Sequence, residues 1–256
     1  MRTLPFAAAA LSALVLTACS EVRGDDRAFG ERVRAYLLEH PEVLEEAISK
    51  LEQKRADETA SNQVKALAAN RRALERDPRD FVANPNGKVT VVEFFDYRCG
   101  YCKSVAPEVI KLVRENPDVR FVFKEWPIFG EISDHAARVQ IANADRPEYL
   151  QVHQRLMAEK ALDEAALERV LRESGVDPAA ARKEAAAKEA AAHLQNNQKL
   201  ARALGIEGTP AFIVGDTLIP GADIQALKQA ISEARGGKGP TRARSADAPV
   251  EAAAAG

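Results

Sequence analysis

The chain has 256 residues, of which 46% are hydrophobic and 29% charged, an ordinary globular composition with apolar material for one sizeable domain plus accessory segments. A formal net charge of -2 provides no basic surface field, and an aromatic content of 5% offers bases few stacking platforms. Both values argue against nucleic acid as a partner.

The first residues are typical of an export signal. Arg2 precedes an apolar stretch from Leu4 to Leu16, which is too short to span a bilayer comfortably. The Leu-Thr-Ala-Cys sequence that ends at Cys19 resembles the bacterial lipobox, in which the cysteine carries a lipid. We therefore expect a lipoprotein-type signal peptide over residues 1–19 and a lipid tether on Cys19. The alternatives are ordinary cleavage near Ala18 with a free cysteine, or a buried N-terminal helix.

Residues 28–76 predict a helical extension. Apolar residues recur there at helical spacing among many Glu, Lys, Arg and Ala residues. Pro41 can open a helix, so the pattern predicts a short helix, a break near His40 and a long amphipathic helix. Such a helix cannot bury its apolar stripe alone, which favours a stalk that pairs with its copies in a homo-oligomer. A helix folded back on its own domain, or a solvated spacer, is the alternative.

A strand–helix–strand pattern follows the extension. Prolines and an Asn-Gly pair predict a loop over residues 77–86, and the apolar run over 88–96 predicts an inner strand. Residues 104–116 read as a helix kinked or broken at Pro107, and residues 119–124 as the next strand. Together they form a βαβ unit.

The remaining elements complete an α/β domain. Residues 133–204 predict an all-helical insertion. Residues 211–214 and 217–219 predict two strands, and 223–235 a closing helix. The last residues, 236–256, are rich in Gly, Pro, Ala and charge and predict a disordered tail.

The chain has three cysteines, so only Cys99 and Cys102 remain for the folded domain once Cys19 is set aside. A disulfide between them closes too short a loop to remove much chain entropy, which favours a working dithiol over a structural bridge. Zinc would need further ligands, and there is no second cysteine pair. The histidines of the predicted helices also lack ligand spacing: His135, His153 and His193. We expect no metal site.

The position of the two cysteines predicts their roles. They follow a strand and open a helix, where unpaired backbone N–H groups and the helix dipole stabilise a thiolate. Cys99 is therefore expected to be the more exposed sulfur and the nucleophile, and Cys102, one turn further, the resolving thiol. Gly100 and Tyr101 between them would tune the redox potential. The alternative is a pair of buried cysteines that never react.

Several segments resemble the DsbA-type thiol-disulfide oxidoreductases, which have the thioredoxin fold. The resemblance is carried by residues 92–102, which end in Cys-Gly-Tyr-Cys, and by the Gly-Thr-Pro-Ala-Phe block at 208–212. Residues 124–130 match as well, and Pro41 to Leu44 match an N-terminal extension of some exported relatives. The resemblance implies a thioredoxin-like α/β domain over residues 80–235 that contains the helical insertion.

The resemblance also implies roles for three further residues. Pro210 would follow a cis peptide bond, and the backbone of Thr209 would hold a client chain beside the cysteines. Glu93 matches an acidic residue that the family buries under the active site, where it would exchange a proton with Cys102. The alternatives for Glu93 are a solvent-facing residue or an ion pair with a lysine.

The implied function is disulfide exchange with cysteines of exported proteins in the periplasm, without a cofactor and with a membrane redox partner that resets the dithiol. The best-known oxidases of the family have Pro-His between the cysteines, whereas this chain has Gly100 and Tyr101. Oxidase, isomerase and reductase directions stay open, although an oligomer suits isomerisation or reduction. Two other functions compete: a dedicated redox or metal-handling partner of one envelope protein, and a structural lipoprotein with an inactive CxxC.

Overall fold

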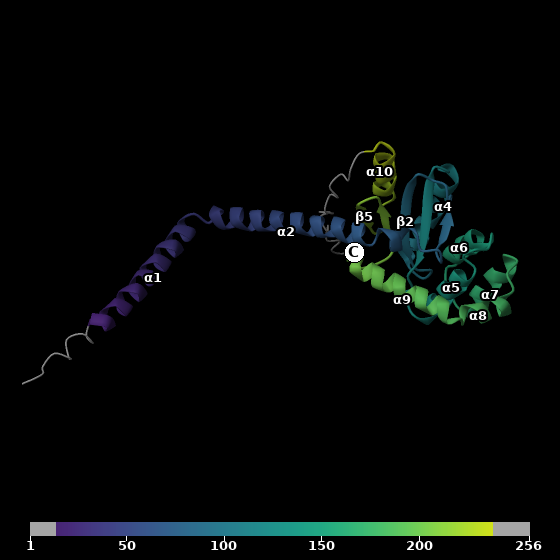
Figure 1. Ribbon diagram of the computed structural model, residues 1–256, viewed down its shortest axis with the longest axis horizontal. Helices are drawn as coiled ribbons and strands as arrows, with labels where there is room; N and C mark the ends of the chain where they lie inside the picture. Colours follow the sequence, from purple (N-terminus) through teal and green to yellow (C-terminus); the bar gives the residue numbers. More distant parts are fainter. Residues whose placement is uncertain (1–13, 238–256) are drawn as a thin grey trace, which may run out of the picture. The chain divides into compact units, whose positions relative to one another are not determined.

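The structure is a computed structural model that describes residues 14–237, with side chains from residue 26 onward (Figure 1). The chain divides into two compact units, one up to Ser61 and one from Asn62. The signal peptide expected over residues 1–19 lies mostly outside the described residues, and of Cys19 only the backbone is described. Beyond Gly237, the predicted tail also lies outside them. The lipid tether and the disordered tail therefore stay predictions.

The first unit consists of helix α1 (Leu14–Glu39) and most of helix α2 (Glu42–Ala69), which are separated at the expected break beside Pro41. None of the described helices is long and apolar enough to cross a bilayer. The two helices nevertheless expose many large apolar side chains in this unit: Phe29, Val33, Tyr36, Leu38, Leu44, Ile48 and Leu51.

The second unit contains a five-stranded sheet with strand order β1-β3-β2-β4-β5. Its central strands β2 (Val89–Phe95) and β3 (Val119–Glu125) run parallel, whereas the other neighbours are antiparallel. Strands β4 (Ala211–Val214) and β5 (Thr217–Pro220) form the closing hairpin. The inner strands are buried on both faces, which explains their nearly continuous apolar sequence.

Strand β1 (Phe81–Ala83) corrects the sequence prediction, which placed a loop over residues 77–86. The strand pairs antiparallel with β3, and its Phe81 ring stacks on Tyr149 with centroids 4.0 Å apart. A strand of three residues between Pro78 and Pro85 is too short to show alternation in the sequence. The strand forms because β3 supplies its hydrogen-bond partners, which are not adjacent in the sequence.

Helix α4 (Gly100–Glu115) begins at the cysteine pair, where the cysteines were expected to open a helix. This start lies four residues before residue 104, where the apolar pattern placed it, and the helix continues through Pro107. Proline removes one backbone donor from the helix interior. The buried face of α4 offsets that loss, since Val105, Val109 and Val113 pack into the core against the sheet.

Two hydrophobic clusters cover the two faces of the sheet. On one face, Val91 and Phe95 of β2 share a cluster with side chains of α4 and of α10 (Ile224–Arg235). On the other face, Val92 and Phe94 pack with the end of α2, α3 (Arg71–Glu75) and α9 (Lys188–Ala203). Because side chains alternate along a strand, Glu93 points to the same face as α4.

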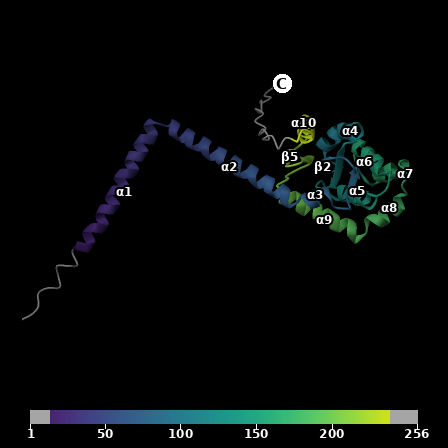
Figure 2. The same cartoon turned by 45° about the horizontal axis from the view of Figure 1, so that its top comes forward.

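Helices fill the chain between β3 and β4, as the all-helical insertion predicts, and α5 to α8 gather beside the sheet (Figure 2). Asp163 and Asp177 accept backbone N–H groups at the starts of α7 and α8, which is the usual role of aspartate there. The bounds are α5 (Glu131–Ala142), α6 (Tyr149–Ala158), α7 (Glu164–Glu173) and α8 (Pro178–Ala185).

Candidate active site

Cys99 stands at the N-terminus of α4, directly after the turn that leaves β2. Its backbone N–H donates to the Asp96 carbonyl at 3.2 Å, and its Sγ accepts the N–H of Cys102 at 3.4 Å. Both cysteines are free thiols, with 3% of Cys99 and 0% of Cys102 exposed. The predicted order of exposure therefore holds only by a small margin.

The Thr209–Pro210 loop lies beside this sulfur. The Thr209–Pro210 peptide bond is cis, as the family resemblance implies. The Cys99 thiol donates a hydrogen bond to the Thr209 carbonyl at 3.2 Å. Since the loop leads directly into β4, the sheet fixes both the cysteine turn and the proline turn at the same edge.

Glu93 and Cys102 lie beneath the surface of the site. Both are buried, and no described group hydrogen-bonds to Oε2 of Glu93. Burial raises the pKa of Glu93 to about 8. Burial also raises the pKa of the Cys102 thiol, and the neighbouring charge of Glu93 raises it further. Each group therefore favours its neutral form.

A surface pocket of about 640 Å³ opens above Cys99. Large apolar side chains stand exposed around it: Tyr101 at 71%, Ile128 at 40% and Phe129 at 46%. Gly100 also lines the pocket, and a Cβ added there would meet no atom within 4 Å. The full lining comprises Cys99, Gly100, Tyr101, Ser104, Ile128, Phe129, Glu207, Gly208 and Thr209.

Ile128, Phe129 and Asp96 had no assigned role in the sequence reasoning. Ile128 and Phe129 lie in the family-matching segment 124–130, and Asp96 lies at the end of the predicted strand and in the family-matching segment 92–102. A Trp-Pro-Ile-Phe-Gly sequence after a buried strand was the available signal, because two large apolar residues in a Pro/Gly turn have no core to enter.

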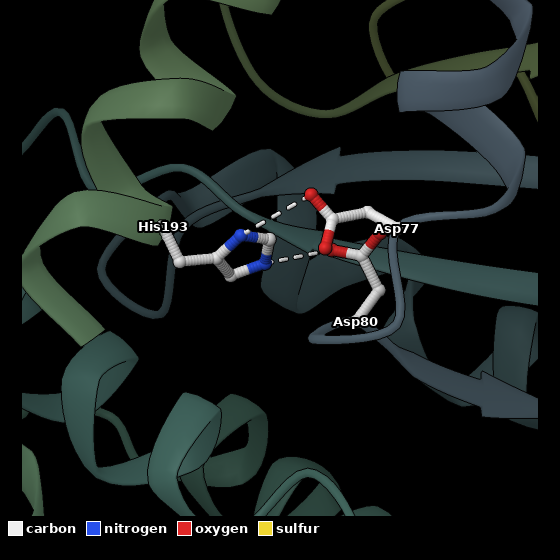
Figure 3. Close-up of side chains that lie close together, drawn as sticks. All are labelled: Asp77, Asp80 and His193. Atoms are coloured by element: carbon white, nitrogen blue, oxygen red, sulfur yellow. Dashed lines mark hydrogen bonds and ion pairs between the residues drawn. The ribbon is translucent and has the colours of Figure 1, made fainter. Parts of the chain in front are cut away.

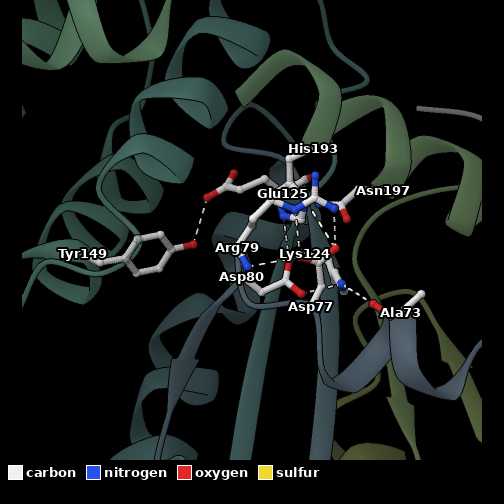
Figure 4. Close-up of polar contacts among 9 residues, drawn as sticks. All are labelled: Ala73, Asp77, Arg79, Asp80, Lys124, Glu125, Tyr149, His193 and Asn197. Atoms are coloured by element: carbon white, nitrogen blue, oxygen red, sulfur yellow. Dashed lines mark hydrogen bonds and ion pairs between the residues drawn. The ribbon is translucent and has the colours of Figure 1, made fainter. Parts of the chain in front are cut away.

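Asp77, Asp80 and His193 form a separate buried cluster of metal-type ligands (Figure 3). Nε2 of His193 lies 2.9 Å from Asp80, and its Nδ1 lies 3.7 Å from Asp77. Lys124 already donates to Asp80 at 2.5 Å, and Arg79 binds Asp77 at 2.6 Å (Figure 4). Two carboxylates thus face two side-chain cations, and a metal ion would have to displace them. We interpret the cluster as a structural ion-pair network.

A second buried polar group surrounds Glu125. Its Oε1 accepts hydrogen bonds from the Tyr97 and Tyr149 hydroxyls at 2.8 and 2.9 Å, and the Tyr97 hydroxyl lies 3.1 Å from His153. Burial raises the pKa of Glu125 well above its usual value and lowers that of His153 to about 3. Asn197 binds the Glu125 backbone and so joins α9 to the end of β3. The group links the insertion to the strand that precedes the Ile128–Phe129 turn.

Comparison with known proteins identifies two family segments. A family model described as thioredoxin matches residues 77–233, and one described as the copper resistance protein ScsC N-terminal domain matches residues 25–58.

Several solved structures resemble the chain, of which three illustrate the similarity. A thioredoxin-like oxidoreductase from Silicibacter pomeroyi DSS-3 is 43% identical, with 65% of this chain and 98% of that chain covered and a TM-score of 0.62. BcfH from Salmonella enterica Typhimurium is 33% identical, with 86% and 100% covered and a TM-score of 0.71. A periplasmic thioredoxin-like protein from the same serovar is 31% identical, with 64% and 94% covered and a TM-score of 0.58.

Among curated relatives, the chain spans about a quarter of an antiporter, NhaA 3 from Salinispora tropica, with 29% identity over 62% of this chain and 25% of that protein. It also matches the thiol:disulfide interchange protein DsbA of Bordetella pertussis, with 31% identity over 50% of this chain and 64% of that protein. With the thioredoxin match over residues 77–233 and the solved structures, these findings show that the chain belongs to the DsbA-type family of thioredoxin-fold thiol-disulfide oxidoreductases, with an N-terminal helical extension.

Proposed function

We propose that the protein catalyses thiol-disulfide exchange with cysteines of client proteins through Cys99 and Cys102. The observation that carries this proposal is the position of the Cys99 sulfur, which stands at the start of α4, 3.2 Å from the carbonyl of the cis-proline loop and beneath a surface pocket. Backbone N–H groups at a helix start stabilise a thiolate, and the pocket gives a client chain access to it.

The exchange follows from this arrangement. The Cys99 thiolate attacks one sulfur of a client disulfide; the client S–S bond breaks, a Cys99–client bond forms, and the released client thiolate takes a proton. Cys102 then attacks the Cys99 sulfur and frees the second client thiolate. The enzyme ends as the Cys99–Cys102 disulfide and the client has gained two electrons. The same steps in reverse oxidise a client.

Glu93 is the proposed proton acceptor for Cys102 during the second step. Two features support this role: Glu93 is close enough for its charge to raise the pKa of Cys102, and no described group occupies its Oε2. A carboxyl group with a pKa of about 8 is poised to gain and lose a proton near neutral pH.

We propose isomerisation or reduction as the physiological direction. The dipeptide between the cysteines has no ionisable group that supports a thiolate at neutral pH, and the charged side chain that lines the pocket is the acidic Glu207. A weakly stabilised thiolate makes the corresponding disulfide a weak oxidant. In this proposal, Gly100 and Tyr101 tune the centre because neither adds a positive charge next to the Cys99 sulfur.

We also propose that the protein is tethered in the periplasm and forms a homo-oligomer. A lipid on Cys19 would tether the protein in the periplasm, where its clients are exported proteins and a membrane redox partner resets the dithiol. The similarity to a periplasmic thioredoxin-like protein supports this location. The exposed apolar residues of α1 and α2 support assembly of the helical extension, expected over residues 28–76, with further copies.

The direct test is to express Cys102→Ala in the periplasm and separate its adducts on non-reducing gels. Attack by Cys99 still occurs in this variant while release is blocked, so mixed disulfides with many exported proteins should accumulate and disappear in the Cys99→Ser/Cys102→Ala double variant. A single trapped protein would favour a dedicated partner of one envelope protein. An absence of adducts would reject the assigned roles and favour a structural lipoprotein.

A further inference from the structure

A pocket of about 490 Å³ lies between α4 and α6, which pack side by side (Figures 1 and 2). It shares no lining residue with the pocket above Cys99. Small-molecule sites in proteins have volumes of about 300–1,000 Å³. The pocket is therefore large enough for a small ligand, and it is separate from the exchange site.

The floor of this pocket is apolar. Ala106 and Ile110 of α4 and Met157 of α6 are buried and line it, and Pro107 adds a side chain without polar atoms. Water in contact with such a surface is released when an apolar group takes its place, which is favourable. The floor therefore favours a ligand with an apolar body.

Cations outnumber acids around the pocket. Lys103, Lys111 and Arg114 line it, against one carboxylate, that of Glu115. Within the described part of the chain, none of these three cations belongs to an ion pair. Arg114 donates instead to the neutral side-chain oxygen of Gln154, at 3.2 Å. The rim thus carries positive charge without a counter-charge.

The carboxylates whose charge acts on the two lysines are bound to other cations. Glu159 binds Arg169 at 2.8 Å, and Glu108 binds Lys228 at 2.6 Å. A cation beside an apolar surface gains more from an anion than it does in open water, because the effective dielectric constant is lower there. The pocket therefore favours an anionic ligand.

The positions of the cations define the direction of such a ligand. Lys111 and Arg114 are exposed and three positions apart on α4, so they stand on one face of the helix. Lys103 lies about 12 Å away from Lys111 along the helix axis. Its amine already donates to the Glu159 carbonyl. A ligand carboxylate therefore finds free donors at the Lys111–Arg114 end.

We propose that this pocket binds an alkyl carboxylate, whose carboxylate bonds to Lys111 and Arg114 and whose chain lies on the apolar floor. A stable protein interface buries about 800 Å² on each partner around an apolar centre. Charged and polar side chains border the floor here, which favours a small ligand over a protein segment. The site is separate from the cysteines, so the proposal does not depend on the exchange function.

Met157 provides a direct readout, since the chain has two methionines and the other is Met1. In the full-length protein labelled with ¹³C-methyl methionine, the Met157 signal is identified by its loss in Met157→Leu. Octanoate should shift this signal until the pocket is saturated. Octylammonium has the same alkyl chain and the opposite charge, so it should bind about tenfold more weakly or less, the order expected for one charged hydrogen bond.

Substitutions then locate the carboxylate. Arg114→Gln should weaken octanoate binding about tenfold and leave the binding of the uncharged octanamide unchanged, because only the charged contact is lost. Arg114 is exposed, so the fold should tolerate its replacement. Arg155→Gln on α6 is the matched control, since Arg155 lies outside the lining and pairs with Glu173. It should change neither affinity.

Three results would overturn the proposal. The first is a Met157 signal that millimolar octanoate does not shift, and the second is equal affinity for octanoate and octylammonium. The third is wild-type affinity for octanoate in Arg114→Gln. A shift produced by an acetylated Leu-Glu-Leu-Glu peptide but not by octanoate would be a case of the first result, and it would assign the pocket to an acidic protein segment instead.

Discussion

The burial of Glu93 should make the stability of the protein depend on pH, and its proposed role should do the same for turnover. Its pKa rises from 4.5 to about 8 because it is buried, so between these values the folded chain holds a proton that the unfolded chain releases. The stability contribution is complete below pH 4.5 and declines as pH rises to about 8. At about 1.4 kcal/mol per pKa unit, the decline amounts to a few kcal/mol. Urea unfolding should show it in the wild type but not in Glu93→Gln; parallel pH profiles would contradict the account.

The same carboxyl group should control the resolving step. In a preformed Cys99–client mixed disulfide, release by Cys102 should accelerate with pH and reach half its maximum near pH 8, where Glu93 ionises. Glu93→Gln should release the client more slowly and without that midpoint. Stopped-flow single-turnover measurements follow this step alone. A variant with the wild-type midpoint would show that another group takes the proton.

Some residues of the candidate site could be predicted from the sequence and others could not. Spacing and the strand–helix context sufficed to propose Cys99 and Cys102 as the redox pair, whereas the roles proposed for Glu93 and Thr209 depended on family resemblance. Asp96 received no role because two of its backbone partners, Ile128 and Phe129, are distant in the sequence and lie on a turn whose position only the folded sheet determines. A carboxylate after a strand is usually solvated, and nothing local indicates otherwise.

Among the structural elements, β3 contributes the buried cation Lys124, whose hydrogen bonds connect the strand to two other segments of the chain. Lys124 is fully buried and donates to Asp80 and to the Ala73 carbonyl, while Asp80 also bonds to His193 on α9. Lys124→Met should leave the Asp80 charge without its cation and cost about 3–5 kcal/mol. The exposed Lys199→Met on α9 is the matched control, with an expected change within about 0.5 kcal/mol. Equal unfolding free energies in denaturant would contradict this role.

The elements with long periodic patterns and the β4–β5 hairpin were predicted well, whereas β1 was not. Strands β2 and β3 follow from their apolar runs, but β1 has three residues and needs its partner strand. The apolar pattern alone placed the start of α4 at residue 104 because Gly-Tyr-Cys has no helix-forming pattern of its own. The position of the cysteines after a strand indicated the earlier start, at which Cys99 caps the helix.

The boundary between the two units determines where a truncated chain must begin in order to test the oligomerisation hypothesis. Leu67 and Leu74 are fully buried in the core of the second unit, so removal of residues up to Leu74 would uncover that core. A chain that starts at Asn62 avoids this. It should be monomeric by light scattering and still react with thiol reagents, whereas the longer chain should be oligomeric. A shortened chain that stays oligomeric would reject the stalk hypothesis.

The proposed isomerase or reductase function is tested most directly by the redox equilibrium between the Cys99–Cys102 dithiol and glutathione. The reactivation of scrambled ribonuclease is measured alongside it. The account predicts a reduction potential more reducing than the value of about -120 mV known for DsbA. It also predicts reactivation that Cys99→Ser abolishes. A potential near that oxidising value with no reactivation would contradict the account and identify the protein as a disulfide donor.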